Sequence, residues 1–303
     1  MTTAIFAFAD NEIQAQALAR ELALPLHRIE CRKFPDGESL VRIQADAAAV
    51  ETAIIFRSLN DPNAKLVELL LAVAALRGNG AQRVMLLAPY LGYMRQDIAF
   101  RSGEAVSQRV IGGLIADHFD GLVTVDPHLH RTGSLGDIAP GIVAIAIRAA
   151  PALVTALRHD FEPASILIGP DRESLSWVRD IADPLGAEML IGEKCRSGDR
   201  DVALALPGIE RVRGRPAIIV DDLVSSGSTL VGCAAMLHAA GATRVEAVVT
   251  HCLADAADLA RLHGAGIDRI RASDSVPGPV ATIPLAGVLG DAIRALGRTG
   301  GAR

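Results

Sequence analysis

Short apolar runs recur along this chain, and longer segments with helical periodicity separate them. Between two of these runs, Leu66, Leu69, Leu70 and Val73 follow the i, i+3, i+4, i+7 spacing of a helix face, and glycines at 78 and 80 mark its end. This alternation predicts an α/β fold of mostly parallel sheets flanked by helices, a class that the 3% aromatic content favours over a β-sandwich. The runs with the length of a buried strand are residues 4–9, 53–56, 84–88, 122–125, 166–168, 217–220 and 245–250.

The chain is long enough for two domains, since it has 303 residues and a typical domain has about 100 to 200. A short internal repeat supports a duplication. Gly80–Val84 and Gly241–Val245 have similar sequences, and each follows a helical segment and leads into an apolar run. We therefore predict two similar α/β domains, residues 1–145 and 146–303.

Charge and hydropathy narrow the classes of partner. The net charge of −5 and the pI near 5.9 provide no general attraction to nucleic acid or to an anionic membrane. No apolar run approaches the roughly 18 residues that a membrane span needs, and the first residues lack the basic start of a signal peptide. The four cysteines form no CxxC pair, which indicates reduced thiols. We expect a cytoplasmic protein without a nucleic-acid or membrane partner.

Two adjacent acids end one of the apolar runs. Asp221 and Asp222 follow the run 217–220, and the loop 225–229 (Ser-Ser-Gly-Ser-Thr) then leads into a predicted helix from Leu230 to Ala240. Backbone N–H groups and hydroxyls at a helix start bind phosphate, whereas paired carboxylates accept hydrogen bonds from vicinal hydroxyls. A sugar phosphate satisfies both groups. A Ser/Gly turn with one capping aspartate fits the same residues.

This segment resembles the ribose 5-phosphate loop of phosphoribosyltransferases and of ribose-phosphate diphosphokinases, the PRPP synthetases. Serine stands at 226 where threonine is usual and at 228 where a second glycine is usual. The resemblance implies two phosphoribosyltransferase-type domains. It also implies that the ribose 5-phosphate ligands are Asp221, Asp222, Ser225, Ser226, Gly227, Ser228 and Thr229.

Two further motifs favour the diphosphokinases within this superfamily. Residues 34–38 (Phe-Pro-Asp-Gly-Glu) are similar to the diphosphokinase loop that reaches ATP from a neighbouring subunit, and residues 89–97 resemble the segment whose Arg-Gln pair contacts ATP. Arginine suits phosphate oxygens because its guanidinium donates in a fork. The implied ATP ligands are Phe34, Asp36, Gly37, Glu38, Arg95, Gln96 and Asp97.

The motif 126–130 (Asp-Pro-His-Leu-His) resembles the Asp-x-His of the same family, in which the histidine contacts ATP-bound magnesium. The resemblance implies Mg²⁺ as cofactor and His128 as a supporting ligand. Because magnesium prefers oxygen ligands, Asp171 is expected to share this role. A zinc site at His128 and His130 lacks a matching Cys/His set elsewhere in the sequence.

Residues 193–196 (Glu-Lys-Cys-Arg) resemble the catalytic Lys-x-Arg segment of the family, which implies catalytic roles for Lys194 and Arg196. Two cations there stabilise the charge of a transferring phosphoryl group. An ordinary solvated loop has the same composition.

Together the resemblances imply a ribose-phosphate diphosphokinase that uses ATP and ribose 5-phosphate and forms at least a homodimer, with a hexamer as the larger option. Two alternatives stay open. A phosphoribosyltransferase leaves the motifs at 34–38 and 95–97 unexplained. A non-catalytic regulatory paralogue is favoured weakly by Ser228 and by the unusual segment 172–177, and is opposed by the presence of both Lys194 and Arg196.

Overall fold

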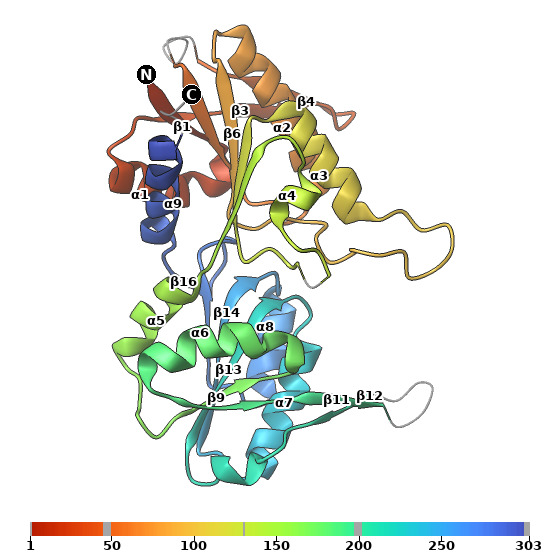
Figure 1. Cartoon of the computed structure of the whole chain (residues 1–303), viewed down its shortest axis with the longest axis vertical. Helices are drawn as coiled ribbons and strands as arrows, with labels where there is room; N and C mark the ends of the chain where they lie inside the picture. Colours follow the sequence, from red (N-terminus) through yellow and green to blue (C-terminus); the bar gives the residue numbers. More distant parts are fainter. Residues whose placement is uncertain (1, 45–49, 130, 197–201, 300–303) are drawn as a thin grey trace. The chain divides into compact units, whose positions relative to one another are not determined.

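The computed structural model of the chain describes residues 2–44, 50–129, 131–196 and 202–299, with the backbone alone described at 194–196, 202–203 and 297–299. The chain divides into two compact units, one made of the residues up to Arg148 together with those from Ala286 onward, the other of Ala149–Leu285 (Figure 1). The sequence-based division at 145/146 left the last helix, α9 (Ala286–Thr299), in the second domain. It belongs to the first unit because it packs on α1 (Glu12–Leu22), where Arg294 Nη2 donates to the Glu21 backbone oxygen at 2.8 Å.

The first unit is built on a six-stranded sheet in the order β2-β1-β5-β6-β7-β8, in which all neighbours are parallel. Its strands are β1 (Thr3–Ala7), β2 (Leu26–Arg28), β5 (Thr52–Phe56), β6 (Arg83–Ala88), β7 (Gly121–Val125) and β8 (Val143–Ile147). Its remaining helices are α2 (Pro62–Gly78), α3 (Ser107–His118) and α4 (Leu135–Ile138), and an antiparallel hairpin joins β3 (Glu30–Lys33) to β4 (Ser39–Arg42). The helix α2 begins with proline, whose fixed φ suits the first helical position.

The second unit repeats this plan with a parallel six-stranded sheet in the order β10-β9-β13-β14-β15-β16. Its strands are β9 (Ile166–Gly169), β10 (Glu188–Ile191), β13 (Pro216–Val224), β14 (Arg244–Cys252), β15 (Arg269–Ser273) and β16 (Ala281–Ile283), and the antiparallel pair β11 (Glu193–Arg196) and β12 (Val202–Ala205) extends from it. Its helices are α5 (Ala150–Arg158), α6 (Leu175–Leu185), α7 (Ser228–Ala239) and α8 (Ala256–Gly264). The predicted duplication of an α/β fold is confirmed.

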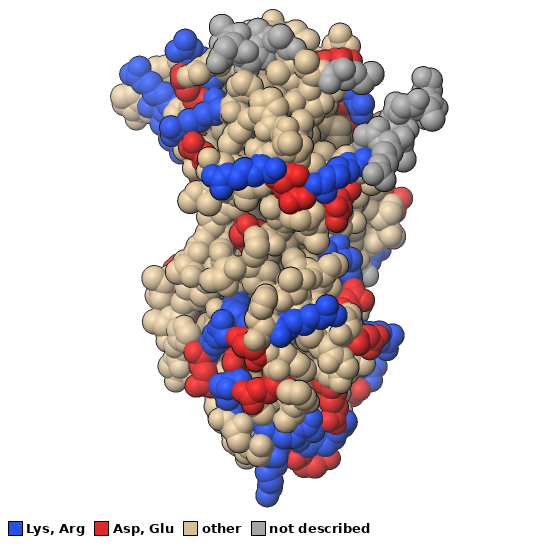
Figure 2. Space-filling model, turned by 90° about the vertical axis from the view of Figure 1, so that its left-hand side faces the viewer, with Lys and Arg blue, Asp and Glu red and all other residues tan. Residues whose placement is uncertain are grey.

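The predicted apolar runs form the inner strands because each can be buried on both faces. They correspond to β1, β5, β6, β7, β9, β13 and β14. Each unit has a hydrophobic core of its own, as expected for independent domains. Within the residues that the structure describes, no helix has both the length and the hydropathy that a membrane span requires. Basic and acidic side chains are interspersed on the face shown in Figure 2.

In both sheets the second strand is added on one side of the first strand, and the later strands are added on the other side. It passes from β1 to β2 on one side and later to β5 on the other, and β9, β10 and β13 repeat this order. Open α/β sheets bind ligands at such switch points, at the carboxyl ends of the strands. The sites expected from topology therefore lie at the ends of β1 and β5 in the first unit, and at the ends of β9 and β13 in the second.

The switch point of the first unit is a crevice of about 700 Å³ whose lining includes Asp10, Arg57, Lys65 and Glu68. Arg57 is 5% exposed and lies over the Phe8 ring at 3.7 Å. Its Nη2 is 2.6 Å from Glu68 Oε2, and Lys65 Nζ is 3.0 Å from Asp10 Oδ2. Basic and acidic groups in this crevice thus pair with one another.

Candidate active site

The two adjacent acids lie within the last part of β13, which continues to Val224. Asp222 is 8% exposed, and its backbone N–H donates to Asp221 Oδ1 at 3.0 Å. Burial raises the pKa of Asp221 well above its ordinary value, and the nearby charges of Asp222 and Asp171 raise it further. The structure therefore brings three of the predicted site carboxylates into one electrostatic group at the switch point of the second unit.

The loop after β13 has the geometry of an anion-binding helix start. α7 begins at Ser228, two residues earlier than the sequence predicted, so Ser228 and Thr229 form its first turn. The N-cap residue is Gly227 (φ 73°), which has no side chain to cap the helix, so the alternative of an aspartate-capped turn does not describe this loop. The first amides of α7 remain for a ligand, and the Ser226 and Ser228 hydroxyl oxygens lie 3.2 Å apart beside them.

The helix α8 supports this loop from behind. Arg261 donates through Nη2 to the Ser226 backbone oxygen and, at 2.7 Å, to Asp258 Oδ1 on the same helix. A Cβ built on Gly227 would lie only 2.8 Å from the Leu262 side chain. The loop is held by contacts that the sequence motif did not reveal, since Asp258 and Arg261 look like an ordinary i, i+3 surface pair.

Asp171 follows β9 and shapes the second strand end of the switch point. Its Oδ1 accepts hydrogen bonds from the backbone N–H groups of Glu173 (3.0 Å) and Ser174 (3.2 Å). The unusual segment 172–177 thus begins with a short 3-10 helix capped by Asp171 and continues into α6. A pocket of about 340 Å³ lies here, lined by Asp171, Arg172, Glu173 and Glu193.

The predicted catalytic pair lies on the extended hairpin. Lys194 and Arg196 belong to β11, where they pair in register with Leu204 and Val202 of β12. Their side chains lie outside the described residues, so their catalytic role remains a prediction from the sequence.

In the first unit, the residues of the Arg-Gln-Asp motif differ in exposure. Arg95 is exposed and Gln96 is half-buried, whereas the Asp97 side chain is only 3% exposed. Asp97 accepts hydrogen bonds from Arg131 Nη1 at 2.9 and 3.2 Å. The structure thus joins this motif to the segment that carries His128, through an arginine that sequence reasoning missed.

The remaining predicted nucleotide ligands form the turn between β3 and β4. Phe34 N–H donates to the Glu38 backbone oxygen at 2.8 Å, and Asp36 Oδ1 accepts from Glu38 N–H at 3.1 Å. Gly37 has φ 93°, a conformation that favours glycine. The turn is exposed, which suits a role at a partner surface. His128 is half-buried after β7, and His130 lies outside the described residues.

The carboxylates of the second unit are the donors available to Mg²⁺. In the part of the chain that the structure describes, no group of three or more His, Cys, Asp or Glu side chains is arranged to hold a metal alone. Burial, and after it the charges of Asp222 and Asp171, raise the pKa of Asp221, and no cation among the described side chains lowers it, so the site is buried and rich in carboxylate oxygens. Such a site fits Mg²⁺, which keeps several waters and shares substrate phosphates with a few carboxylates.

The cluster of Asp171, Asp221 and Asp222 should affect the stability of the ligand-free protein. Asp222→Asn is expected to stabilise the ligand-free protein by on the order of 1 kcal/mol near neutral pH, as substitutions at strained sites often do. The pKa of Asp221 is raised in the folded state, so stability falls as pH rises through that pKa, and removing the Asp222 charge weakens this fall. Urea unfolding at several pH values measures the difference. The difference in the free energy of unfolding between variant and wild type should vanish in acid, where Asp221 is protonated. An equal difference at every pH would contradict the electrostatic cause.

The two units have the same strand order, and the second carries adjacent acids and a Ser/Gly loop at its switch point. This architecture defines the phosphoribosyltransferase fold class. Family models agree: residues 3–118 match the N-terminal domain of ribose phosphate pyrophosphokinase, and residues 140–274 match the phosphoribosyl transferase domain. The chain belongs to the ribose-phosphate pyrophosphokinase family, also called the PRPP synthetases, because relatives of that name match it along almost its whole length.

These relatives come from distant organisms. A ribose-phosphate pyrophosphokinase of Methanopyrus kandleri is 32% identical over 96% of this chain and 99% of its own. One from Bradyrhizobium diazoefficiens is also 32% identical, over 93% of this chain and 91% of its own. In fold, the chain resembles the phosphoribosylpyrophosphate synthetase of Mycobacterium smegmatis, with a TM-score of 0.85, 24% identity and coverage of 99% and 100%.

Proposed function

We propose that the protein is a ribose-phosphate diphosphokinase that makes 5-phospho-α-D-ribose 1-diphosphate from ATP and ribose 5-phosphate. The 1-hydroxyl oxygen of the sugar bonds to the β-phosphorus of ATP while the bond from that phosphorus to the α,β-bridging oxygen breaks. AMP leaves with the bridging oxygen, and the hydroxyl proton passes to solvent. The observation that carries the proposal is the full-length similarity to ribose-phosphate pyrophosphokinases, with motifs similar to those of the family in the same order.

The second unit is proposed to bind the sugar phosphate. The loop 225–229 holds the 5-phosphate through the first amides of α7 and its hydroxyls. Asp221 and Asp222 accept hydrogen bonds from the 2- and 3-hydroxyls and thereby orient the 1-hydroxyl for in-line attack. Lys194 and Arg196 stabilise the charge of the transferring group, and a loose transition state requires little help from a general base.

The first unit is proposed to position ATP. Arg95 and Gln96 bind the nucleotide, while Phe34, Asp36, Gly37 and Glu38 contact the ATP of a neighbouring subunit, so the active protein is a homo-oligomer. Mg²⁺ on the ATP phosphates would be held in part by His128 and Asp171, and when bound it neutralises phosphate charge. The match of residues 3–118 to a pyrophosphokinase-specific domain supports this reading over a single-domain phosphoribosyltransferase. We propose a cytoplasmic location for the protein.

The reaction predicts a strict dependence on both substrates. With ATP and Mg²⁺, the purified protein is expected to form AMP only when ribose 5-phosphate is present. The amount of AMP should equal the amount of the sugar diphosphate, which ³¹P NMR measures. Chromatography of the nucleotides measures AMP. Ribose, which lacks the 5-phosphate, is the control and should give none. A protein that binds ribose 5-phosphate yet forms no AMP would be the regulatory paralogue instead.

A further inference from the structure

The proposed nucleotide ligands Arg95 and Gln96 lie at the base of a long connection. It runs from the end of β6 at Ala88 to the start of α3 at Ser107 and contains no strand or helix. Its outer part is exposed, including the large apolar side chains of Ile98 (39%) and Phe100 (62%). Connections of this length are conformationally variable unless contacts restrain them, so the ligands need an anchor.

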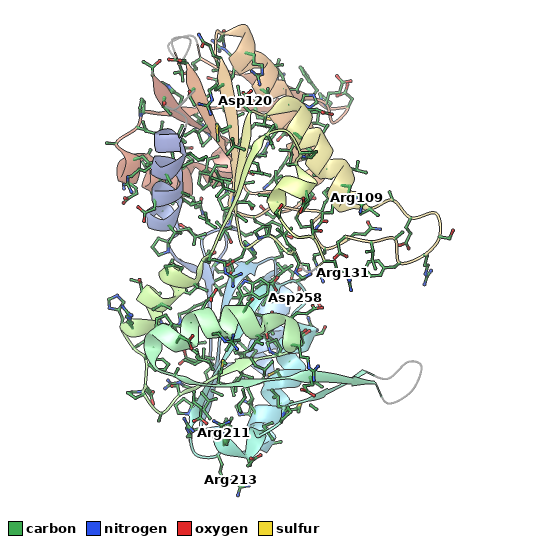
Figure 3. The ribbon with its side chains drawn as sticks, in the orientation of Figure 1. Arg109, Asp120, Arg131, Arg211, Arg213 and Asp258 are labelled. Carbon is green, nitrogen blue, oxygen red and sulfur yellow. The ribbon has the colours of Figure 1, made fainter. Side chains whose placement is uncertain are left out.

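The contact between Asp97 and Arg131 is one anchor. The Asp97 carboxylate is 3% exposed and therefore faces the protein, while Arg131 is 55% exposed and holds both carboxylate oxygens through Nη1. Arg131, labelled in Figure 3, lies on the segment that follows β7 in the chain. Charge-assisted hydrogen bonds of this kind fix relative position as well as adding energy.

A second set of contacts supports the same base from the other side. Gln108 is 2% exposed, and its Nε2 donates to the Met94 backbone oxygen at 3.2 Å. Its Oε1 accepts from Thr132 Oγ1 at 2.8 Å, and Ser107 Oγ donates to Gln96 Oε1. Thus the base of the connection is tied to two consecutive residues, Arg131 and Thr132, that come shortly after His128.

We propose that Arg131 is a positioning residue for ATP, acting through Asp97. The pair joins the connection that carries Arg95 and Gln96 to the segment that carries His128, so that both are presented to one nucleotide in a constant relative position. The role of these three ligands rests on the proposed function. Asp97 accordingly acts by holding Arg131 and not by contacting ATP.

The pair's effect on binding can be separated from any effect on folding. Arg131 is largely exposed, and Asp97→Asn removes the pair without leaving a buried charge unpaired, so the Asp97→Asn protein should stay folded with little loss of stability. Displacement of a binding residue by a fraction of an ångström to one ångström, in contrast, costs up to about a hundredfold in function. We expect about a tenfold effect on ATP, since Gln108 still restrains the connection.

The experiment compares Arg131→Gln, Asp97→Asn and the double variant with Arg109→Gln, an exposed arginine of α3 shown in Figure 3. Each variant of the pair should raise KM for ATP about tenfold, and the double variant should be no worse than either single one, because all three lose the same contact. KM for ribose 5-phosphate should match that of the wild type in all variants, and the thermal midpoint should do so in Asp97→Asn and in the double variant, which leave no buried charge unpaired. Arg131→Lys should restore part of the ATP affinity.

Hydrogen exchange of residues 91–106 tests the inference without any activity. Exchange should be faster in both single variants than in wild type and in Arg109→Gln. If the wild type forms no AMP, the proposed function fails, and exchange still decides on the anchor. The proposed role of Arg131 would be overturned by any of three results: unchanged exchange, additive effects of the two substitutions, or a KM for ATP no higher than that of Arg109→Gln.

Discussion

Replacing Lys194 with alanine is expected to lower kcat for AMP formation by about a hundredfold to a thousandfold, with little change in KM for either substrate. Cations aimed at charge that develops in the transition state are worth about this much, because they act on the transition state more than on the bound substrates. Single-turnover formation of AMP at saturating substrate measures the chemical step directly.

The matched control for Lys194→Ala is Arg213→Ala. Arg213 is an exposed cation of the same unit, labelled in Figure 3, and it has no part in the proposed site. Its loss should leave kcat unchanged. If Lys194→Ala stays within about threefold of the wild type, the extended hairpin is not catalytic and the phosphoryl charge is stabilised elsewhere.

Replacing Gly227 with alanine is expected to raise KM for ribose 5-phosphate by about ten- to a hundredfold. The glycine has φ 73°, which costs other residues about 1–2 kcal/mol, and the added Cβ would meet Leu262 at 2.8 Å. Both effects displace the loop, and with it the amides proposed to bind phosphate. Isothermal titration with ribose 5-phosphate measures the affinity, and urea unfolding measures the stability.

Gly232→Ala is the control for Gly227→Ala. Gly232 is exposed in α7, and a Cβ there would meet nothing within 4 Å. Alanine at such a helical position should stabilise the protein by about 0.5–1 kcal/mol and leave the sugar affinity unchanged. A Gly227→Ala protein that is less stable but binds ribose 5-phosphate normally would show that the phosphate lies away from this loop.

The strands that the sequence predicted are those whose burial on both faces requires an unbroken apolar run. The shorter or partly exposed strands were missed. β8 is half exposed along its length, and β15 contains a buried arginine, Arg271, which is tolerated because Asp160 (2.9 Å) and Glu246 (3.1 Å) pair with it. The packing of α9 on α1 joins residues far apart in sequence, which periodicity within a segment does not reveal.

The site was predictable where the motif itself supplies the chemistry and was missed where distant residues support it. The acids and the loop at 221–229 form a continuous stretch. Their types and spacing fit a sugar-phosphate site as well as an ordinary capped turn, and the resemblance to the family favours the first. Arg131 and Arg261 hold the motifs from outside, 34 residues from Asp97 and 35 from Ser226. In the sequence, neither arginine can be told from an ordinary surface arginine, and only the fold brings each one to its partner.

The two switch points show how one duplicated plan has diverged. In the first unit, Arg57 and Lys65 meet Glu68 and Asp10, so the crevice neutralises itself. In the second, burial raises the pKa of Asp221, and the nearby charges of Asp222 and Asp171 raise it further. The charges at the first switch point are thus compensated within the protein. The second switch point keeps buried carboxylates, and a bound sugar or cation would supply the hydrogen bonds or positive charge that they lack.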